Sequence, residues 1–244
     1  MSVSDRPEGA LLRAAEDARF ADIATLSPPG GLLIISPHPD DETLGCGQAL
    51  AAAVDAGRQV GIVLLTDGEG SHPASHAFPR DRLIDLRAGE LRHALTHLAG
   101  DRQVPIHRLG LRDGASGVAD VTPDAMREIL AFSRSLGTRT VWSTWGRDPH
   151  CDHECAALLA ARVASELSVP HWGFAVWGRF GDGPVPGAIV RFDDPALAPA
   201  KRRAMNAYAS QLTGLIDDDP GAFVMPETLC EHFASHPEVF VREG

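Results

Sequence analysis

The stretch that decides the fold is Leu32-Leu33-Ile34-Ile35-Ser36-Pro37-His38-Pro39-Asp40-Asp41-Glu42. Its first half is short, aliphatic and uninterrupted, which predicts a buried strand over residues 32–36. Its second half places one imidazole and three carboxylates within five residues. Burying an unpaired carboxylate costs on the order of several kcal/mol, so such a cluster at a strand exit requires a counter-charge. The simplest counter-charge is a divalent cation.

Outward from this stretch, apolar strand patterns alternate with amphipathic helix patterns. This alternation implies right-handed βαβ units. We therefore expect an α/β fold, a Rossmann-like three-layer α/β/α arrangement with a mainly parallel sheet. No linker-like segment divides the chain, so residues 1–244 are predicted to form a single domain, with an N-terminal helix over 8–25 as an extension. Further strands are expected at 59–66, 106–109, 140–144, 171–176 and 189–192, and helices at 44–56, 82–98, 124–135, 152–167 and 197–209.

Each chemically distinctive cluster follows one of the expected strands. Residues 36–42 follow the first strand, 67–72 the second, Arg112-Asp113 the third and 146–154 the fourth. Open parallel sheets bind ligands at the carboxyl ends of their strands. The clusters should therefore meet at one edge of the sheet.

Residue chemistry at this edge suggests a metal centre. His38 and Asp41 supply a nitrogen and an oxygen of the kind that zinc takes. One more imidazole, from His150 or His153, would complete three ligands and leave a position for water, as catalytic sites do. Asp40 is then free to act as a base. The residues alone leave the choice between the two later histidines open.

Two other interpretations of the first motif were weighed. The carboxylates could belong to a helix N-terminus, where exposed N–H groups and the helix dipole favour Asp and Glu. The histidine before them and the second His/Asp cluster argue against that reading. Gly45-Cys46-Gly47 could bind a cofactor, but it lacks the third glycine of the dinucleotide fingerprint and is crowded by acidic groups.

Composition excludes several classes of protein. The net charge is −11 and no basic stripe is present, which argues against nucleic-acid binding. The first residues lack an apolar signal core, and no run approaches the roughly 18 apolar residues of a membrane span. A cytoplasmic protein is expected, and its oligomeric state is left open, a homo-oligomer included. The four cysteines form no CxxC pair and are interpreted as reduced thiols.

The two clusters together resemble a known family. Pro37-His38-Pro39-Asp40-Asp41-Glu42, followed later by His150-Cys151-Asp152-His153, is similar to the PIG-L/LmbE-like de-N-acetylase superfamily. Its members are zinc-dependent hydrolases that act mostly on N-acetylglucosaminyl compounds. Arg87-Ala88-Gly89-Glu90 resembles the family's Arg-x-x-Glu helix, and the segment from Lys201 to Gln211 resembles its late Lys-x-x-Ala-x-x-x-Tyr-x-Ser-Gln motif.

The resemblance implies a role for each matched residue. His38, Asp41 and His153 would bind zinc, and Asp40 would be the general base. His150 would face the substrate carbonyl. Asp152 would orient His150 and hold it protonated. Cys151 stands where the family often has proline, and its thiol is expected to point into the core between helix and sheet.

Two further positions are candidate substrate contacts. Arg87 could donate to a sugar hydroxyl or a carboxylate, or it could form an ion pair with Glu90 or Asp85. Asp113 could accept from sugar hydroxyls, or it could cap a loop. His72 and His76 lie in a Pro/Gly-rich loop and are expected to be exposed.

The expected function is metal-dependent removal of an N-acetyl group from an amino sugar. The substrate would be a small N-acetylated sugar and the cofactor Zn²⁺, although Fe²⁺, Co²⁺ or Mn²⁺ also suits such ligands. One alternative is an amidase or esterase acting on another N-acyl metabolite or a thiol conjugate. A second is a non-catalytic metal- or sugar-binding module, against which Asp40 argues because binding alone needs no base.

Overall fold

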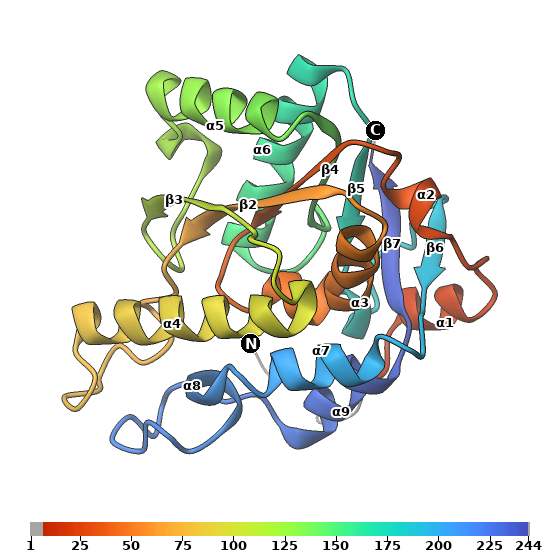
Figure 1. Ribbon diagram of the computed structural model, residues 1–244. Coiled ribbons are helices and arrows are strands. Elements are labelled where there is room, and N and C mark those ends of the chain that lie inside the picture. The colour runs from red at the N-terminus through yellow and green to blue at the C-terminus, as the bar shows by residue number, and fades with distance from the viewer. Residues whose placement is uncertain (1–6, 244) are drawn as a thin grey trace.

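A seven-stranded sheet forms the centre of the protein, and helices cover both of its faces (Figure 1). The computed structural model describes residues 7–243. The first five strands in spatial order are parallel, and the last two run antiparallel to their neighbours. In spatial order the strands are β3 (Ile106–Leu111), β2 (Gln59–Thr66), β1 (Gly31–Ser36), β4 (Thr138–Thr144), β5 (His171–Phe174), β7 (Glu238–Glu243) and β6 (Ile189–Phe192).

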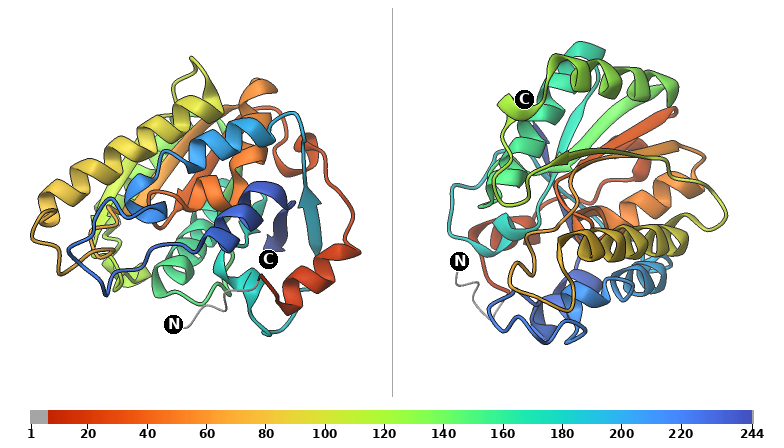
Figure 2. Two further views of the ribbon diagram at one scale, coloured as in Figure 1. Left: turned by 90° about the horizontal axis from the view of Figure 1, so that it is seen from below. Right: turned by 90° about the vertical axis from the view of Figure 1, so that its left-hand side faces the viewer.

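Two helical layers enclose the sheet, as the edge-on view in Figure 2 shows. One layer consists of α5 (Pro123–Ser135) and α6 (Cys151–Leu167). The other contains α3 (Asp41–Asp55), α4 (Arg80–Ala99), α7 (Ala198–Met205) and α9 (Glu227–Ser235). Side chains of β1 alternate between the two layers: Leu32 and Ile34 join one apolar cluster, and Leu33 and Ile35 join the other. A strand buried on both faces needs this continuous aliphatic run.

The strand order reverses direction between β1 and β4. From β1 the chain moves outward through β2 to β3, and from β4 it moves the other way to β5. Loops leaving the carboxyl ends of β1 and β4 therefore diverge, which is where open α/β sheets bind ligands. The segments 36–42 and 146–154 both start at this point. The predicted mainly parallel α/β fold is confirmed, and two of the predicted clusters lie at its switch point.

The helices begin where local chemistry allows. Thr122 caps α5 by accepting the N–H of Ala125, and Pro123 occupies the first turn. α3 begins at Asp41, three residues before the expected start, with Asp41 and Glu42 in its first turn. It is broken at Cys46, whose backbone leaves the helical region (φ −145°, ψ 25°).

Both ends of the chain differ from expectation. The single helix predicted over 8–25 is wrong: the segment forms α1 (Ala10–Glu16) and α2 (Ile23–Leu26), the latter capped by Asp22. Between them Phe20 makes a β-bridge to Arg191, which pulls the backbone out of the helix. The sequence predicts no element after residue 209, whereas α8 (Ala209–Leu212), α9 and β7 follow. Within residues 7–243 no helix is long and apolar enough to cross a membrane.

Candidate metal centre and active site

Three side chains from two strand exits converge on one point. His38 and Asp41 come from the loop after β1 and the start of α3, and His153 comes from the first turn of α6. Their ligand atoms all lie within 4.8 Å of one another. Asp41 Oδ2 is 3.0 Å from His38 Nδ1 and 3.4 Å from His153 Nε2. The structure thus brings together the three residues predicted as metal ligands.

His153 shows that this point suits a cation. Its Nδ1 lies 2.9 Å from Asp148 Oδ2, which fixes Nδ1 as the protonated nitrogen and leaves a lone pair on Nε2. Nε2 is fully buried and has no hydrogen-bond partner among the described residues. A lone pair that faces a carboxylate oxygen at 3.4 Å is repulsive unless a positive charge lies between them. The donor set of two imidazoles and one carboxylate therefore fits a divalent metal.

Two further carboxylates contact His38 on the Nε2 side of its ring. Its Nε2 lies 3.0 Å from Asp152 Oδ2 and 3.1 Å from Asp113 Oδ1. Burial alone would lower the pKa of His38, but hydrogen bonds to Asp113 and Asp152 raise it well above its ordinary value. When Nε2 of His38 donates to Asp113 and Asp152, its Nδ1 faces Asp41. This is the arrangement in which a carboxylate orients a metal-binding imidazole.

Asp152 therefore differs from its expected role. Its carboxylate accepts hydrogen bonds from Ser116 Oγ and from the N–H groups of Ser116 and Gly114, in addition to His38. These donors outweigh burial and hold the pKa of Asp152 far below its usual range. The nearest nitrogen of His150 is 3.9 Å from Asp152 Oδ2, beyond hydrogen-bond distance. The carboxylate of Asp152 therefore contacts His38, whereas only the backbone N–H of Asp152 bonds His150.

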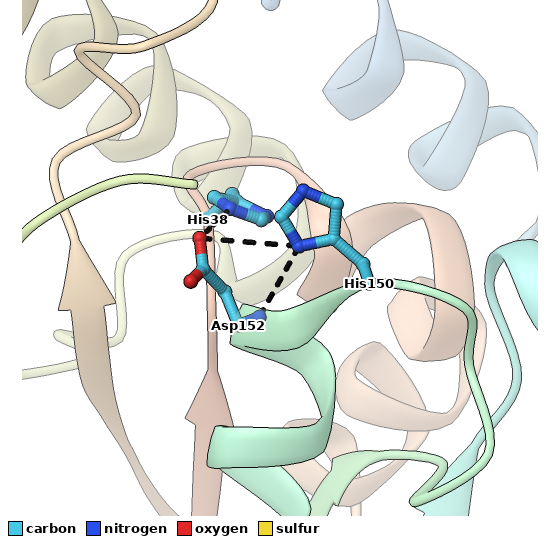
Figure 3. A group of neighbouring side chains, drawn as sticks. All are labelled: His38, His150 and Asp152. Carbon is cyan, nitrogen blue, oxygen red and sulfur yellow. Dashed lines mark hydrogen bonds and ion pairs between the residues drawn. The ribbon is translucent and has the colours of Figure 1, made fainter. Parts of the chain in front are cut away.

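His150 nevertheless lies at the centre of the site. Figure 3 shows it beside Asp152 at the start of α6, with its ring turned toward His38. Its ring centroid is 5.0 Å from that of His38 and 5.2 Å from that of His153. Nδ1 accepts the backbone N–H of Asp152 at 3.2 Å, so a proton belongs on Nε2. Burial and the neighbouring His38 lower the pKa of His150, in contrast to the protonated state expected from the sequence.

Asp40 stands next to the ligand Asp41 and is held by Arg87. Arg87 Nη2 lies 3.0 Å from Asp40 Oδ2 and also donates to the carbonyl of Pro39, while Nη1 donates to the carbonyl of Gly68. Burial raises the pKa of Asp40 to about 7, although Arg87 opposes the shift. A carboxyl group with that pKa can exchange protons near neutrality.

The two predicted substrate contacts are engaged inside the protein. Arg87 is 3% exposed and pairs with Asp40, and not with Glu90 or Asp85. Asp113 accepts the N–H of Gly70 at 2.7 Å and borders His38 with its second oxygen. Arg87 and Asp113 therefore join the predicted cluster, with protein partners that the sequence does not reveal.

Loop residues and cysteines also depart from expectation in part. His72 is buried, whereas His76 is exposed as predicted. All four cysteines are free thiols. Cys151 is exposed, and its Sγ lies 3.5 Å from Asp152 Oδ1, so the expectation that it points into the core is wrong. Cys151 follows the N-cap residue His150, where the helix has not yet entered the layer that covers the sheet.

Asp148 is a site residue for which the sequence analysis proposes no role. It is 4% exposed and accepts, besides the proton of His153, the backbone N–H groups of Val176, Trp177 and Gly178. The signal that could have found it is its position five residues before His153 in the second motif. A metal-binding imidazole needs an acceptor for its other nitrogen.

Fold and site together define an α/β protein with a candidate divalent-metal centre at the switch point of its sheet. Residues 33–164 match the family described as PIG-L, GlcNAc-PI de-N-acetylase. The chain belongs to this family.

Individual relatives agree with this assignment. A protein of Kineococcus radiotolerans named 1D-myo-inositol 2-acetamido-2-deoxy-alpha-D-glucopyranoside deacetylase is 34% identical over 113 residues, covering 44% of this chain and 30% of the relative. Its namesake from Streptomyces avermitilis is 30% identical over 228 residues, covering 78% of this chain and 74% of that one. Among solved structures, a zinc-inhibited form of teicoplanin deacetylase has a TM-score of 0.59 at 20% identity, covering 87% of this chain and 98% of that one, a likeness of fold.

Proposed function

We propose that this protein is a metal-dependent N-deacetylase that hydrolyses the acetamide of an N-acetylglucosamine-type substrate to acetate and a free amine. The observation that carries the proposal is the convergence of His38, Asp41 and His153 on one point with Asp40 beside it. A binding module would need the three ligands, but it would have no use for an additional carboxyl group, Asp40, with a pKa of about 7. Membership of the PIG-L family and the names of the relatives support the same chemistry.

The metal would be held by His38 Nδ1, Asp41 Oδ2 and His153 Nε2. Bound there, a divalent ion lowers the pKa of a coordinated water and polarises the amide carbonyl. We propose zinc as this ion, because two imidazoles and one carboxylate form a common catalytic zinc set. Fe²⁺, Co²⁺ and Mn²⁺ suit the same donors, so activity should be compared after reconstitution with each. The zinc-inhibited relative makes the zinc concentration a necessary variable in that comparison.

Asp40 and His150 would handle the protons and charges of the reaction. Asp40 takes the proton of the attacking water and returns it to the departing amine. The Arg87 guanidinium, 3.0 Å away, fixes the carboxylate for this transfer. His150, whose Nδ1 accepts from the backbone, presents Nε2–H as a donor to the oxyanion that forms on the former carbonyl. A neutral imidazole suffices for this role.

The test uses the metal-loaded protein and N-acetylglucosamine conjugates, with the release of free amine as the readout. Asp40→Asn should retain the metal and lose about 10²- to 10⁴-fold in kcat, the usual cost of removing a general base. Asp55→Asn is the matched control, because Asp55 is exposed at the C-terminal end of α3, the helix that begins at Asp41. It should keep the wild-type rate.

Three results would separate the proposal from its alternatives. Amine release from the sugar that disappears in Asp40→Asn supports it. Hydrolysis confined to other N-acyl compounds or esters would show that the substrate is not an amino sugar and would favour the amidase or esterase alternative. Near wild-type turnover in a metal-loaded Asp40→Asn protein would sink the assignment of the base.

A further inference from the structure

Glu42 is a buried carboxylate to which the proposed reaction gives no task. It is 0% exposed, yet its hydrogen-bond donors are neutral. Oε1 accepts the hydroxyl groups of Tyr208 at 2.5 Å and Thr43 at 2.6 Å. Oε2 accepts the backbone N–H of Asp40 at 3.3 Å, and the same N–H also donates to the carbonyl of His38 at 3.0 Å. A buried carboxylate is costly to maintain without a cation partner, so its contacts identify what it contributes.

The contact with Asp40 falls on an unusual piece of backbone. Asp40 has φ 157° and ψ −30°, and only one other non-glycine residue of the described chain, Ser168, has a positive φ. Such a conformation persists only where the surroundings enforce it. Asp40 also makes no side-chain cap to α3, although it is the residue that precedes the helix. Its carboxylate is turned away, toward Arg87.

Tyr208 reaches this point from a distant part of the chain. It lies at the junction of α7 and α8, in the late motif of residues 201–211, and is 1% exposed. Its hydroxyl bonds Glu42 across 166 positions of sequence. The hydroxyl groups of Thr43 and Tyr208 both donate to Oε1 and so fix the side-chain conformation of Glu42. Its Oε2 therefore stays within reach of the Asp40 N–H.

We propose that Glu42 and Tyr208 are positioning residues that fix the backbone of Asp40 and so aim its carboxylate at the reacting water. Asp40 is then held from two sides, its side chain by Arg87 and its N–H by Glu42 together with the carbonyl of His38. Without the hydroxyl of Tyr208, Glu42 gains rotameric freedom and the strained backbone of Asp40 relaxes. A misplaced base lowers the rate because proton transfer requires hydrogen-bond geometry. This proposal rests on the proposed function, in which Asp40 is the base.

The first experiment measures kcat, KM and metal affinity in Tyr208→Phe, which removes a single oxygen. We expect kcat to fall about 10-fold while KM and metal affinity stay within about twofold of wild type. Glu42→Gln should fall at least as far. The double variant should be no slower than Glu42→Gln alone, because the two residues act through one contact.

The matched control is Thr140→Val. Thr140 also has a fully buried hydroxyl with a backbone acceptor, the carbonyl of Leu26, and it lies in β4. Removing the Thr140 hydroxyl should lower the free energy of unfolding about as much as removing the Tyr208 hydroxyl does, because each removes one buried hydrogen bond. It should leave kcat unchanged. A merely structural role for Tyr208 would make the two variants alike in kcat.

A second measurement needs no substrate. Amide hydrogen exchange at Asp40, followed by NMR, should be several-fold faster in Tyr208→Phe and in Glu42→Gln than in wild type or Thr140→Val, because one of the two acceptors of this N–H becomes mobile while the His38 carbonyl remains. Unchanged exchange at Asp40 would overturn the proposal, whatever the activity. So would full kcat in both variants while Asp40→Asn is inactive, and so would loss of metal from Tyr208→Phe. Activity that survives in Asp40→Asn would instead contradict the proposed function.

Discussion

At the scale of single residues, the candidate metal centre depends on groups other than its three predicted ligands. Asp148 is the clearest case, because it fixes the tautomer of His153 while three backbone N–H groups hold it in place. Replacing such a partner usually costs 10- to 100-fold in metal affinity. We therefore expect Asp148→Asn to weaken metal binding by about that factor, measured by competition with a chelator. The control is Glu154→Gln. Glu154 is exposed and follows His153 in the first turn of α6, so this variant should bind metal as wild type does. Equal affinity in both variants would refute this role.

The sequence predicts the metal ligands better than it predicts their supports. His38, Asp41 and His153 have the donor types that metals select, and each follows a strand that ends at the same edge, so their meeting can be expected. Partner choice is different. Asp152 faces His38 because Ser116 and Gly114 hold its carboxylate from a loop nearly 40 positions away. The packing of the loop that contains Gly114 and Ser116 thus determines which histidine Asp152 contacts. The sequence around Asp152 does not predict this contact.

At the scale of the elements, α3 is two helical segments joined at Cys46, and a buried ion pair closes the gap. Glu238 of β7 accepts the N–H groups of Gln48 and Ala49, while Lys201 of α7 donates to the carbonyl of Leu44 and to Glu238. The break leaves the N–H groups of Gln48 and Ala49 and the carbonyl of Leu44 without partners inside the helix. Glu238 and Lys201 form hydrogen bonds with them instead. Helix positions follow from sequence periodicity, but this break depends on a strand 190 positions away.

Removing one member of this pair should be strongly destabilising. Lys201→Met leaves Glu238 as an unpaired charge at 0% exposure, which costs about 3–5 kcal/mol in the free energy of unfolding. Arg202→Met is the matched control on the same helix, since Arg202 forms a half-exposed pair with Glu231. Exposed pairs contribute about 0–1 kcal/mol. Urea unfolding of both variants checks the contrast, and similar midpoints would contradict it.

At the scale of the whole molecule, the sequence predicts the five parallel strands and β6, but it does not predict β7. Buried aliphatic runs separated by helices predict the five parallel strands, because right-handed crossovers allow few other arrangements. β7 arrives from the C-terminus and inserts between β5 and β6. That insertion follows from pairing between segments far apart in the sequence, such as Trp172 with Arg242, which local patterns do not report.

The free energy of unfolding should depend on pH in a way that reflects a buried histidine, His171, at the start of β5. His171 is 5% exposed; Nε2 lies 2.8 Å from Ser143 Oγ, and Nδ1 has no partner among residues 7–243. Burial, aided by Arg242, lowers the pKa of His171 to about 4. The unfolded chain binds this proton near pH 6.5 and the folded protein does not. The contribution of His171 to stability is therefore complete above pH 6.5 and is lost as the pH falls toward 4.

Because other groups titrate in the same range, the test compares two proteins. His171→Gln keeps a polar group toward Ser143 but binds no proton. As the pH falls from 6.5 to 4.5, wild type should lose up to about 1.4 kcal/mol per pH unit relative to the variant, or roughly 2 kcal/mol in total. Urea unfolding at several pH values measures this difference directly. Parallel stability curves would mean that the pKa of His171 is the same in the folded and unfolded protein, and they would contradict a burial that excludes its proton.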